Sequence, residues 1–192
     1  GGNSGPLVLT VARALELARQ VNALVTRVGG TLLVTTSART PRRSADALLD
    51  SLAAPGFVFR YPSTGDNPYR GLLACGDRFV VTGDSMSMLA EACGTGRPVH
   101  LYDFADTRPW WRDPSAYRWK PFVHRLAMSI GPRRMRRDVR LIHRALLERG
   151  RIRLLDDPHE AEPNAHVGAD DELLRTALRV RALLRHEVPG TS

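Results

Sequence analysis

The segment from Val80 to Phe104, VVTGDSMSMLAEACGTGRPVHLYDF, constrains the fold of this chain more than any other. It predicts a strand ending at Val81, a turn, a helix that begins after Ser85, and a second strand from Val99 to Tyr102. The helix would therefore open at the carboxyl end of a strand, where unpaired backbone N–H groups and the helix dipole attract anions. Glu91, inside the same helix, could accept hydrogen bonds from ribose hydroxyls. The segment thus predicts a nucleoside-diphosphate site.

Helix and strand patterns alternate along most of the chain. Helices are expected before Gly29-Gly30, after Pro41 to about Ala53, and at 69–75, and strands at 31–36, 57–61, 78–82 and 99–102. The run from Thr31 to Thr36, with Leu32, Leu33 and Val34 in succession, is expected to be a buried strand. This order predicts an α/β fold, a Rossmann-like doubly wound parallel sheet.

Composition narrows the class of protein. A hydrophobic content of 43% suits a well-packed domain, and no apolar run approaches the roughly 20 residues that span a bilayer. The two cysteines, Cys75 and Cys93, are expected to be reduced and buried in a cytoplasmic protein. The six histidines show no ligand spacing, so we expect no metal and no cofactor.

Most of the net charge of +8 lies between Arg133 and Arg153, a segment that contains a predicted helix from about Pro132 to Arg149. Its arginines Arg133, Arg137, Arg140 and Arg144 lie opposite the apolar positions Met135, Val139, Ile142 and Leu146. Such a face is either solvated or in contact with an anionic membrane surface, which would make the protein peripheral at the inner membrane. No nucleic acid is expected as a partner, because no nucleic-acid-binding motif accompanies the charge.

The two ends of the chain carry separate expectations. The start, GGNSGP, is a glycine-rich turn with no strand before it, so we expect a missing first strand and a missing N-terminal domain. A short strand at Leu7 to Thr10 is the alternative. Beyond the nucleotide-binding domain of residues 1–155, an acidic linker is predicted at 156–170 and an amphipathic helix at 171–186.

Three sequence blocks carry a resemblance to a known family: TTSARTP at 35–41, GDNPYRGLLACGD at 65–77, and VTGDSMSMLAEACGTGRPVHLYDF at 81–104. Together with HRALLERGRIRLL at 143–155, they resemble the glycosyltransferase-like family related to the plant mitochondrial fission factor ELM. Bacterial members are often labelled nucleoside-diphosphate-sugar epimerases. Ala38 departs from the pattern, because a second arginine is expected beside Arg39, and this weakens the anion-binding expectation there.

The resemblance implies a fold and a site. The family is similar to GT-B glycosyltransferases, whose C-terminal Rossmann-like domain binds the nucleotide-sugar donor. Glu91 would hold the ribose, and Ser85, Met86 and Ser87 the diphosphate. The remaining implied residues are Gly1, Gly2, Asn3 and Ser4 of the glycine loop, Ser37, Arg39 and Thr40 after the next strand, and Asn67, Pro68 and Tyr69 near the base or acceptor. All follow the carboxyl ends of predicted strands, where ligands bind in such sheets.

Each role has a structural alternative. Glu91 could pair with Arg97 on the helix surface, and Asp84 or Ser85 could serve only as the helix N-cap. Arg39 could merely solvate its loop, and Asn67 could shape a turn before proline.

Three functions remain open. The first is the donor-binding half of a metal-independent GT-B glycosyltransferase with an unknown acceptor. The catalytic base of that enzyme would lie in the missing domain, so this chain alone would bind nucleotide without catalysis. The second is a GT-B-fold nucleotide-sugar epimerase. An NAD-dependent epimerase is not expected, because Lys120 follows Tyr117 by three residues rather than four. The third is a non-catalytic interaction module of the kind the plant relatives imply in fission.

Overall fold

The structure, a computed structural model, describes residues 2–3, 7–53, 55–104, 139–157, 175–179 and 181. Several predictions fall outside these residues. They concern Gly1 and Ser4, the arginines Arg133 and Arg137, and most of the acidic linker and of the C-terminal helix, of which the structure describes a helical stretch at 175–179.

The described elements follow the predicted order. The helices are α1 (Val11–Val28), α2 (Arg42–Asp50), α3 (Tyr69–Cys75), α4 (Met86–Gly94) and α6 (Val139–Glu148), and the strands are β1 (Leu32–Thr35), β2 (Pro55–Phe59), β3 (Phe79–Thr82), β4 (Val99–Tyr102) and β5 (Arg153–Leu154). The alternative strand at Leu7 to Thr10 does not form, since only Leu7 makes an isolated bridge.

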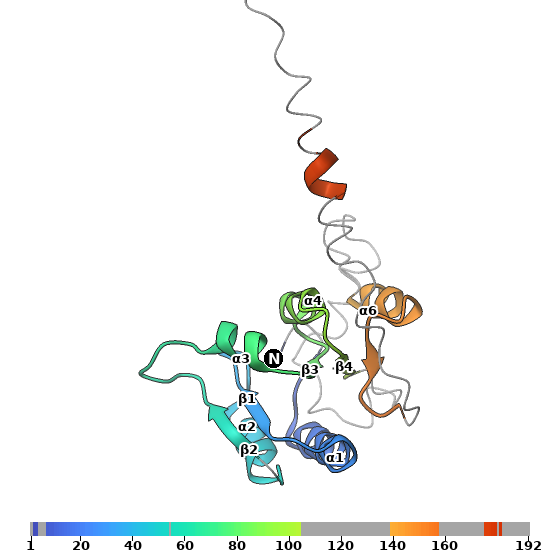
Figure 1. The fold of residues 1–192 in the computed structure, drawn as a ribbon. Helices are drawn as coiled ribbons and strands as arrows, with labels where there is room; N and C mark the ends of the chain where they lie inside the picture. The colour runs from blue at the N-terminus through green and yellow to red at the C-terminus, as the bar shows by residue number, and fades with distance from the viewer. Residues whose placement is uncertain are drawn as a thin grey trace, which may run out of the picture.

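The strands are parallel and form two sheets, β1-β2 and β3-β4-β5. Helices lie on both sides of the strands, with α4 and α6 on one side and α1 and α2 on the other (Figure 1). This mixed α/β arrangement is consistent with a Rossmann-like fold, as the sequence predicted.

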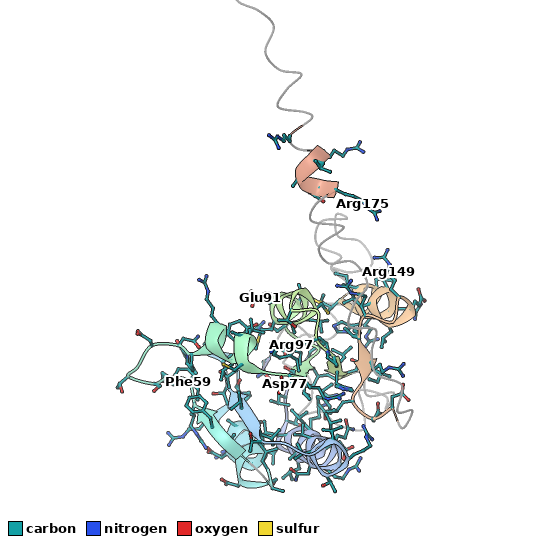
Figure 2. The ribbon with its side chains drawn as sticks, in the orientation of Figure 1. Phe59, Asp77, Glu91, Arg97, Arg149 and Arg175 are labelled. Carbon is teal, nitrogen blue, oxygen red and sulfur yellow. The ribbon has the colours of Figure 1, made fainter. Side chains whose placement is uncertain are left out.

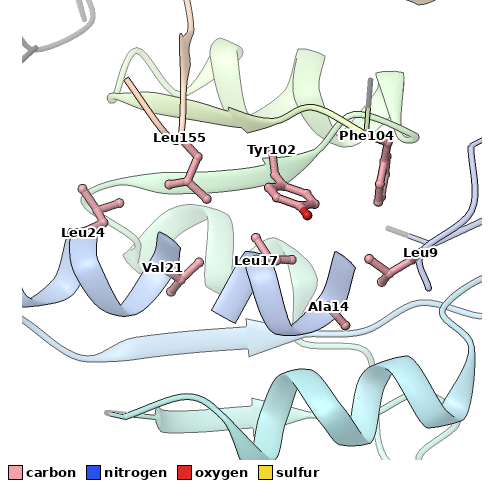
Figure 3. Close-up of a cluster of buried hydrophobic side chains, with 8 residues drawn as sticks. All are labelled: Leu9, Ala14, Leu17, Val21, Leu24, Tyr102, Phe104 and Leu155. Carbon is pink, nitrogen blue, oxygen red and sulfur yellow. The ribbon is translucent and has the colours of Figure 1, made fainter. Parts of the chain in front are cut away.

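Two apolar clusters form the core. The first packs α1 against residues of β4 and the segments that follow β4 and β5 (Figure 3), and its members are Leu9, Ala14, Leu17, Val21, Leu24, Tyr102, Phe104 and Leu155. The second joins β3, β4 and α4, and its members are Val81, Leu89, Ala92, Val99, Leu101 and Ile152. Side chains from β3 and β4 enter both clusters, so this sheet is covered on both faces.

The buried face of α6 differs from the prediction. His143 is buried and Leu146 and Leu147 pack against the second cluster, whereas Ile142 is 49% exposed. The cause is tertiary: His143 packs on Gly83, where an added Cβ would lie 3.0 Å from the His143 Cε1 atom. Docking at this point rotates the helix away from the orientation that periodicity indicated. Arg140 and Arg144 are exposed on α6.

Two expectations of burial are wrong. The strand β1 is not buried, since Leu33 is 42% exposed and its other residues are only partly buried. Both cysteines are free thiols, as expected, but Cys75 is exposed at the end of α3. Cys93 is half-buried, and burial raises the pKa of its thiol.

Within the described part of the chain, no helix has the length and apolarity needed to cross a membrane.

Candidate functional site

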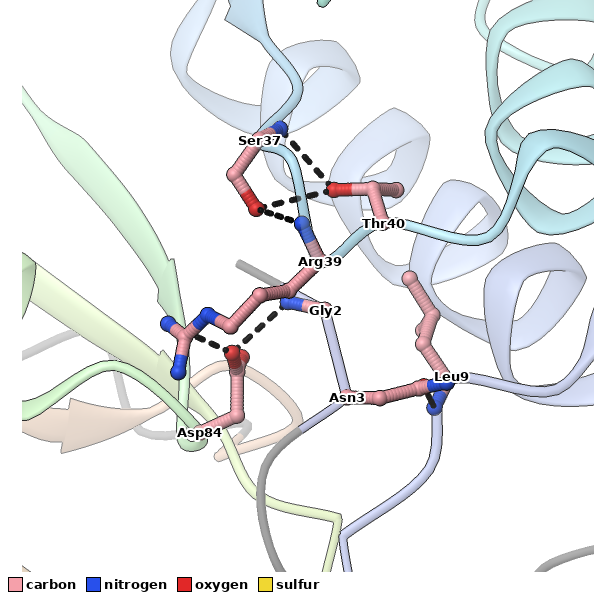
Figure 4. Close-up of polar contacts among 7 residues, drawn as sticks. All are labelled: Gly2, Asn3, Leu9, Ser37, Arg39, Thr40 and Asp84. Carbon is pink, nitrogen blue, oxygen red and sulfur yellow. Dashed lines mark hydrogen bonds and ion pairs between the residues drawn. The ribbon is translucent and has the colours of Figure 1, made fainter.

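The candidate site lies at the carboxyl ends of β1 and β3, where three segments meet at the side chain of Asp84. The Gly2 N–H donates to Asp84 Oδ2 at 2.7 Å, and Arg39 Nη2 lies 3.2 Å from the same oxygen (Figure 4). The Asp84 side chain is fully buried, while that of Arg39 is 44% exposed. A buried carboxylate requires such partners, and here it ties the amino-terminal segment to the loops after both strands.

Gly2 fits this junction because it has no side chain. A Cβ at this position would lie 2.2 Å from the carbonyl carbon and oxygen of Arg39, closer than real atoms approach. The neighbouring Asn3 N–H donates to the Arg39 carbonyl at 2.9 Å, and Asn3 Oδ1 accepts from the Leu9 N–H at 2.9 Å. Gly2 and Asn3 are therefore held against the loop after β1.

Hydroxyl groups shape the loop after β1. The Ser37 N–H donates to Thr40 Oγ1 at 2.9 Å, the two hydroxyl oxygens lie 3.2 Å apart, and the Arg39 N–H donates to Ser37 Oγ at 3.3 Å. These contacts orient Arg39 toward Asp84. Ser37 and Thr40, two of the predicted site residues, thus have a structural role, because they position Arg39.

The amino terminus of α4 follows Asp84 directly. Ser85 is buried at the N-cap position but its side chain makes no capping hydrogen bond, so the capping alternative is wrong for its hydroxyl. The first intrahelical bond runs from the Leu89 N–H to the Ser85 carbonyl at 3.0 Å. The N–H groups of Met86, Ser87 and Met88 therefore have no partner within the helix and can bind an anion.

Glu91 lies further along α4, exposed on its surface (Figure 2). It does not pair with Arg97, whose guanidinium donates instead to the carbonyl oxygens of Ala74 and Gly76 at the end of α3. The neighbour of Glu91 is Tyr69 of α3: burial, and then this carboxylate, raise the pKa of the tyrosine hydroxyl.

Asn67 has a structural role in the conformation described here. Its Oδ1 accepts a hydrogen bond from the Tyr69 N–H at 3.1 Å, so it shapes the turn that opens α3. Because α3 brings Tyr69 to Glu91, the segment from Asn67 to Tyr69 lies beside α4.

The structure brings the predicted residues into two neighbouring groups. Gly2, Asn3 and Arg39 meet at Asp84, beside the opening turn of α4, and Glu91 lies with Tyr69 further along the same helix. Asp84 is the residue that the sequence analysis missed as a site residue. Its position directly before the helix was visible in the sequence, but such an acid is also typical of a cap.

Comparison with known proteins places the chain in a family. The chain matches the family model described as mitochondrial fission ELM1 over residues 1–184. It belongs to the mitochondrial fission ELM1 family. Over 81 residues it is 40% identical to the mitochondrial fission protein ELM1 of Arabidopsis thaliana, a match that covers 42% of this chain and 19% of that relative. The matched part thus spans about a fifth of the relative's length. No solved structure matches the chain.

Proposed function

We propose that this chain binds the nucleoside diphosphate of a sugar donor, as the donor-binding half of a GT-B-type glycosyltransferase. One observation carries the proposal. Residues 2–3, the loop after β1 and the loop after β3 converge on the buried Asp84 beside the open amino terminus of α4. Binding at such a carboxyl edge is the general behaviour of parallel α/β sheets.

Within this proposal the diphosphate lies against the N–H groups of Met86 and Ser87, with the exposed part of the Arg39 guanidinium as a further donor. The ion pair with Asp84 holds Arg39 and offsets part of its charge. The donors available to phosphate are thus mainly backbone N–H groups and the helix dipole.

The ribose lies at Glu91. Ser87 and Glu91 are four residues apart and so share one face of α4. The rise along the helix between them is about 6 Å, a separation on the order of that between a diphosphate and its ribose hydroxyls. A carboxylate accepts hydrogen bonds from two neighbouring hydroxyls, which suits a ribose.

The chemistry proposed for the site is stabilisation of the departing diphosphate. Backbone N–H groups and the helix dipole at α4 are already oriented before charge develops, which lowers the barrier to transfer of the sugar. We place the catalytic base in an upstream domain, so this chain alone would bind the nucleotide without transferring sugar. A nucleotide-sugar epimerase of the same fold would use the same site.

A second candidate is a non-catalytic module in fission, favoured by the name of the Arabidopsis relative. Exposed Arg140 and Arg144 on α6 would then contact an anionic membrane surface, which would also suit a transferase whose acceptor is membrane-borne.

Calorimetric titration of UDP, GDP, ADP and CMP separates these functions. We expect one diphosphate to bind preferentially and Glu91→Gln to weaken its binding at least about tenfold, or about 1.4 kcal/mol. Glu148→Gln, which alters an exposed glutamate on α6, is the matched control and should leave binding unchanged. Equal, weak binding of all four nucleotides that high salt abolishes regardless of Glu91 would contradict the proposal and favour the interaction module.

A further inference from the structure

Within the described part of the chain, the strand β2 is paired on one side only. Its partner is β1, and it lies on the far side of β1 from β3 and β4 (Figure 1). Its side chains are exposed on both faces of the sheet, Phe57 on one face and Val58 on the other. We call residues 57–60 the open edge of β2. An apolar strand edge of this kind is a template for pairing with another strand.

The backbone presents hydrogen-bonding groups to the open edge of β2. The Phe59 carbonyl accepts from the Thr36 N–H, and the Tyr61 N–H donates to Thr36 Oγ1, so residues 59 and 61 point toward β1. Because successive residues of a strand point their backbone groups to opposite sides, the N–H and C=O groups of Val58 and Arg60 point away from β1. A second extended strand can therefore add to β2 at these two residues.

Features that prevent such pairing lie only in the first part of β2. Pro55 has no N–H, and Gly56 lies at the register shift between β1 and β2. The segment from Phe57 to Phe59 contains neither proline nor charge. Beyond it, the charge of Arg60 is offset by an ion pair with Asp46 of α2. The open edge of β2 thus lacks the usual protection against pairing.

Helix α2 turns a charged side toward the open edge of β2. The opposite side, which is packed toward α1 and its cluster, is formed by Ser44, Ala45 and Leu48. Arg43, Asp46 and Asp50 are three, four and seven residues apart and so share one side of the helix. The ion pair between Asp46 and Arg60 shows that this side is directed toward the end of β2.

The charges of α2 are placed against its own dipole. Arg42 and Arg43 lie in the first turn and Asp50 in the last, with no acidic residue at the start and no basic residue at the end. The helix dipole favours the opposite order, so these charges weaken α2 considered alone. Beside an antiparallel helix of the same sequence, however, Arg43 meets the Asp50 and the negative end of that helix. The order of charges is therefore complementary to a second, antiparallel α2.

We infer that the open edge of β2 is an interface between two copies of this chain. A two-fold axis perpendicular to the sheet at Val58 makes the two β2 strands antiparallel neighbours. Val58 then exchanges both of its backbone hydrogen bonds with the partner's Val58, and Phe57 lies opposite the partner's Phe59. The axis keeps both α2 helices on one face of the joined sheet, where Arg43 pairs with the partner's Asp50. The inference is independent of nucleotide binding.

Sedimentation velocity of the 192-residue chain, over a range of concentrations, measures the association. We expect a monomer–dimer equilibrium that Val58→Pro and Val58→Lys each weaken at least about tenfold, since proline removes the donor at the axis and lysine places like charges opposite each other. Both variants keep the hydrogen bonds between β1 and β2, because the Val58 N–H points away from β1. Val11→Lys on α1, at a valine 42% exposed against 39% for Val58, is the matched control and should leave the dimer unchanged.

Charge reversal on α2 tests the antiparallel arrangement. Arg43→Asp and Asp50→Arg should each weaken the dimer about tenfold, because each turns two attractive contacts between the copies into repulsive ones. The double variant should restore association, since both contacts form again with reversed sign. The two positions lie about 10 Å apart along one helix, too far to pair within a copy, so this rescue identifies a contact between copies.

Amide hydrogen exchange locates the contact. The Val58 and Arg60 amides should exchange more slowly as the protein concentration rises, whereas those of Phe59 and Tyr61, which point toward β1, should not change. A chain that stays monomeric at millimolar concentration would overturn the inference, as would a dimer that the Val58 variants leave intact. Protection of Val58 and Arg60 at every concentration would assign the open edge of β2 to another segment of the same chain and overturn the second copy as its occupant.

Discussion

At the scale of single residues, Asp84 determines whether the candidate site exists. Its buried carboxylate accepts from Gly2, 82 residues away in the chain, and pairs with Arg39. No other described contact ties all three segments together at one atom. The geometry of the site therefore depends on an ion pair in which the Asp84 carboxylate is buried and the Arg39 guanidinium is partly exposed.

We predict that Asp84→Ala lowers the free energy of unfolding by about 1–3 kcal/mol, because it leaves the buried Gly2 N–H without an acceptor and Arg39 without its counter-ion. Asp77→Ala removes an exposed carboxylate before β3 and should cost less than about 0.5 kcal/mol. Urea unfolding measures both. Equal losses in the two variants would show that Asp84 does not hold the loops.

The sequence analysis identified Gly2 and Arg39 as site residues but did not predict that both contact Asp84. The resemblance implies that Gly2, Asn3 and Arg39 belong to one site, whereas the sequence offers Asp84 only as one of two alternative N-caps. Capping and long-range pairing require the same residue type, so a single sequence does not distinguish them. The same ambiguity applies to Asn67, which shapes a turn in the structure.

At the scale of elements, α1 shows how local sequence sets a helix. Thr10 accepts from the Arg13 N–H at its start, and Gly29 ends it with a φ of 74°. Within it, Glu16 accepts from Arg19 and Gln20 on the solvent side. The hydrogen bond from Arg19 lowers the pKa of Glu16 to about 2, although burial, a smaller effect, acts to raise it.

This shift predicts a pH-dependent contribution to stability. Because the folded-state pKa of Glu16 lies below its value of 4.5 in the unfolded chain, the contribution is complete above about pH 4.5 and is lost as pH falls through about 2. The Glu16 side chain is 43% exposed, so solvent screens the pair and we expect Glu16→Gln to cost only a few tenths of a kcal/mol at pH 7.

Urea unfolding of Glu16→Gln and the unmodified chain, at pH 7 and near pH 2, measures the effect. The difference between them should shrink at the lower pH, while Glu148→Gln, on the exposed surface of α6, provides the comparison. A penalty of the same size at both pH values would mean that the pairing with Arg19 contributes nothing.

Element boundaries were predictable where local signals were strong, but orientations were not. The bounds of α3 and β4 match the prediction, since Pro68 and Gly76 flank α3, and Pro98 directly precedes the β-branched Val99 that begins β4. The buried face of α6 depends on His143 meeting Gly83, and the 42% exposure of Leu33 in β1 depends on β1 pairing with β2 alone among the described strands. Both are properties of packing between distant segments, which periodicity does not encode.

At the scale of the whole molecule, the two sheets are joined on one side by α1. The Tyr102 hydroxyl, on β4, donates to the Arg13 carbonyl of α1 at 2.9 Å. Tyr102 and Phe104 stack edge to face at 5.6 Å, and the Arg13 guanidinium lies 5.9 Å from the Phe104 ring centre. The alternating pattern predicted the α/β class, but only the structure shows that this helix connects the two sheets.

This arrangement predicts that a small change on α1's interface weakens both sheets. Tyr102→Phe removes one hydroxyl and should lower the free energy of unfolding by about 1 kcal/mol, since the Arg13 carbonyl loses a partly buried donor. Tyr61→Phe, at a tyrosine that is 49% exposed, is the matched control and should be neutral. Because α1 bridges the sheets, amide exchange should accelerate in β2 and in β5 alike. Acceleration confined to β3, β4 and β5 would show instead that the two sheets unfold separately and that α1 does not couple them.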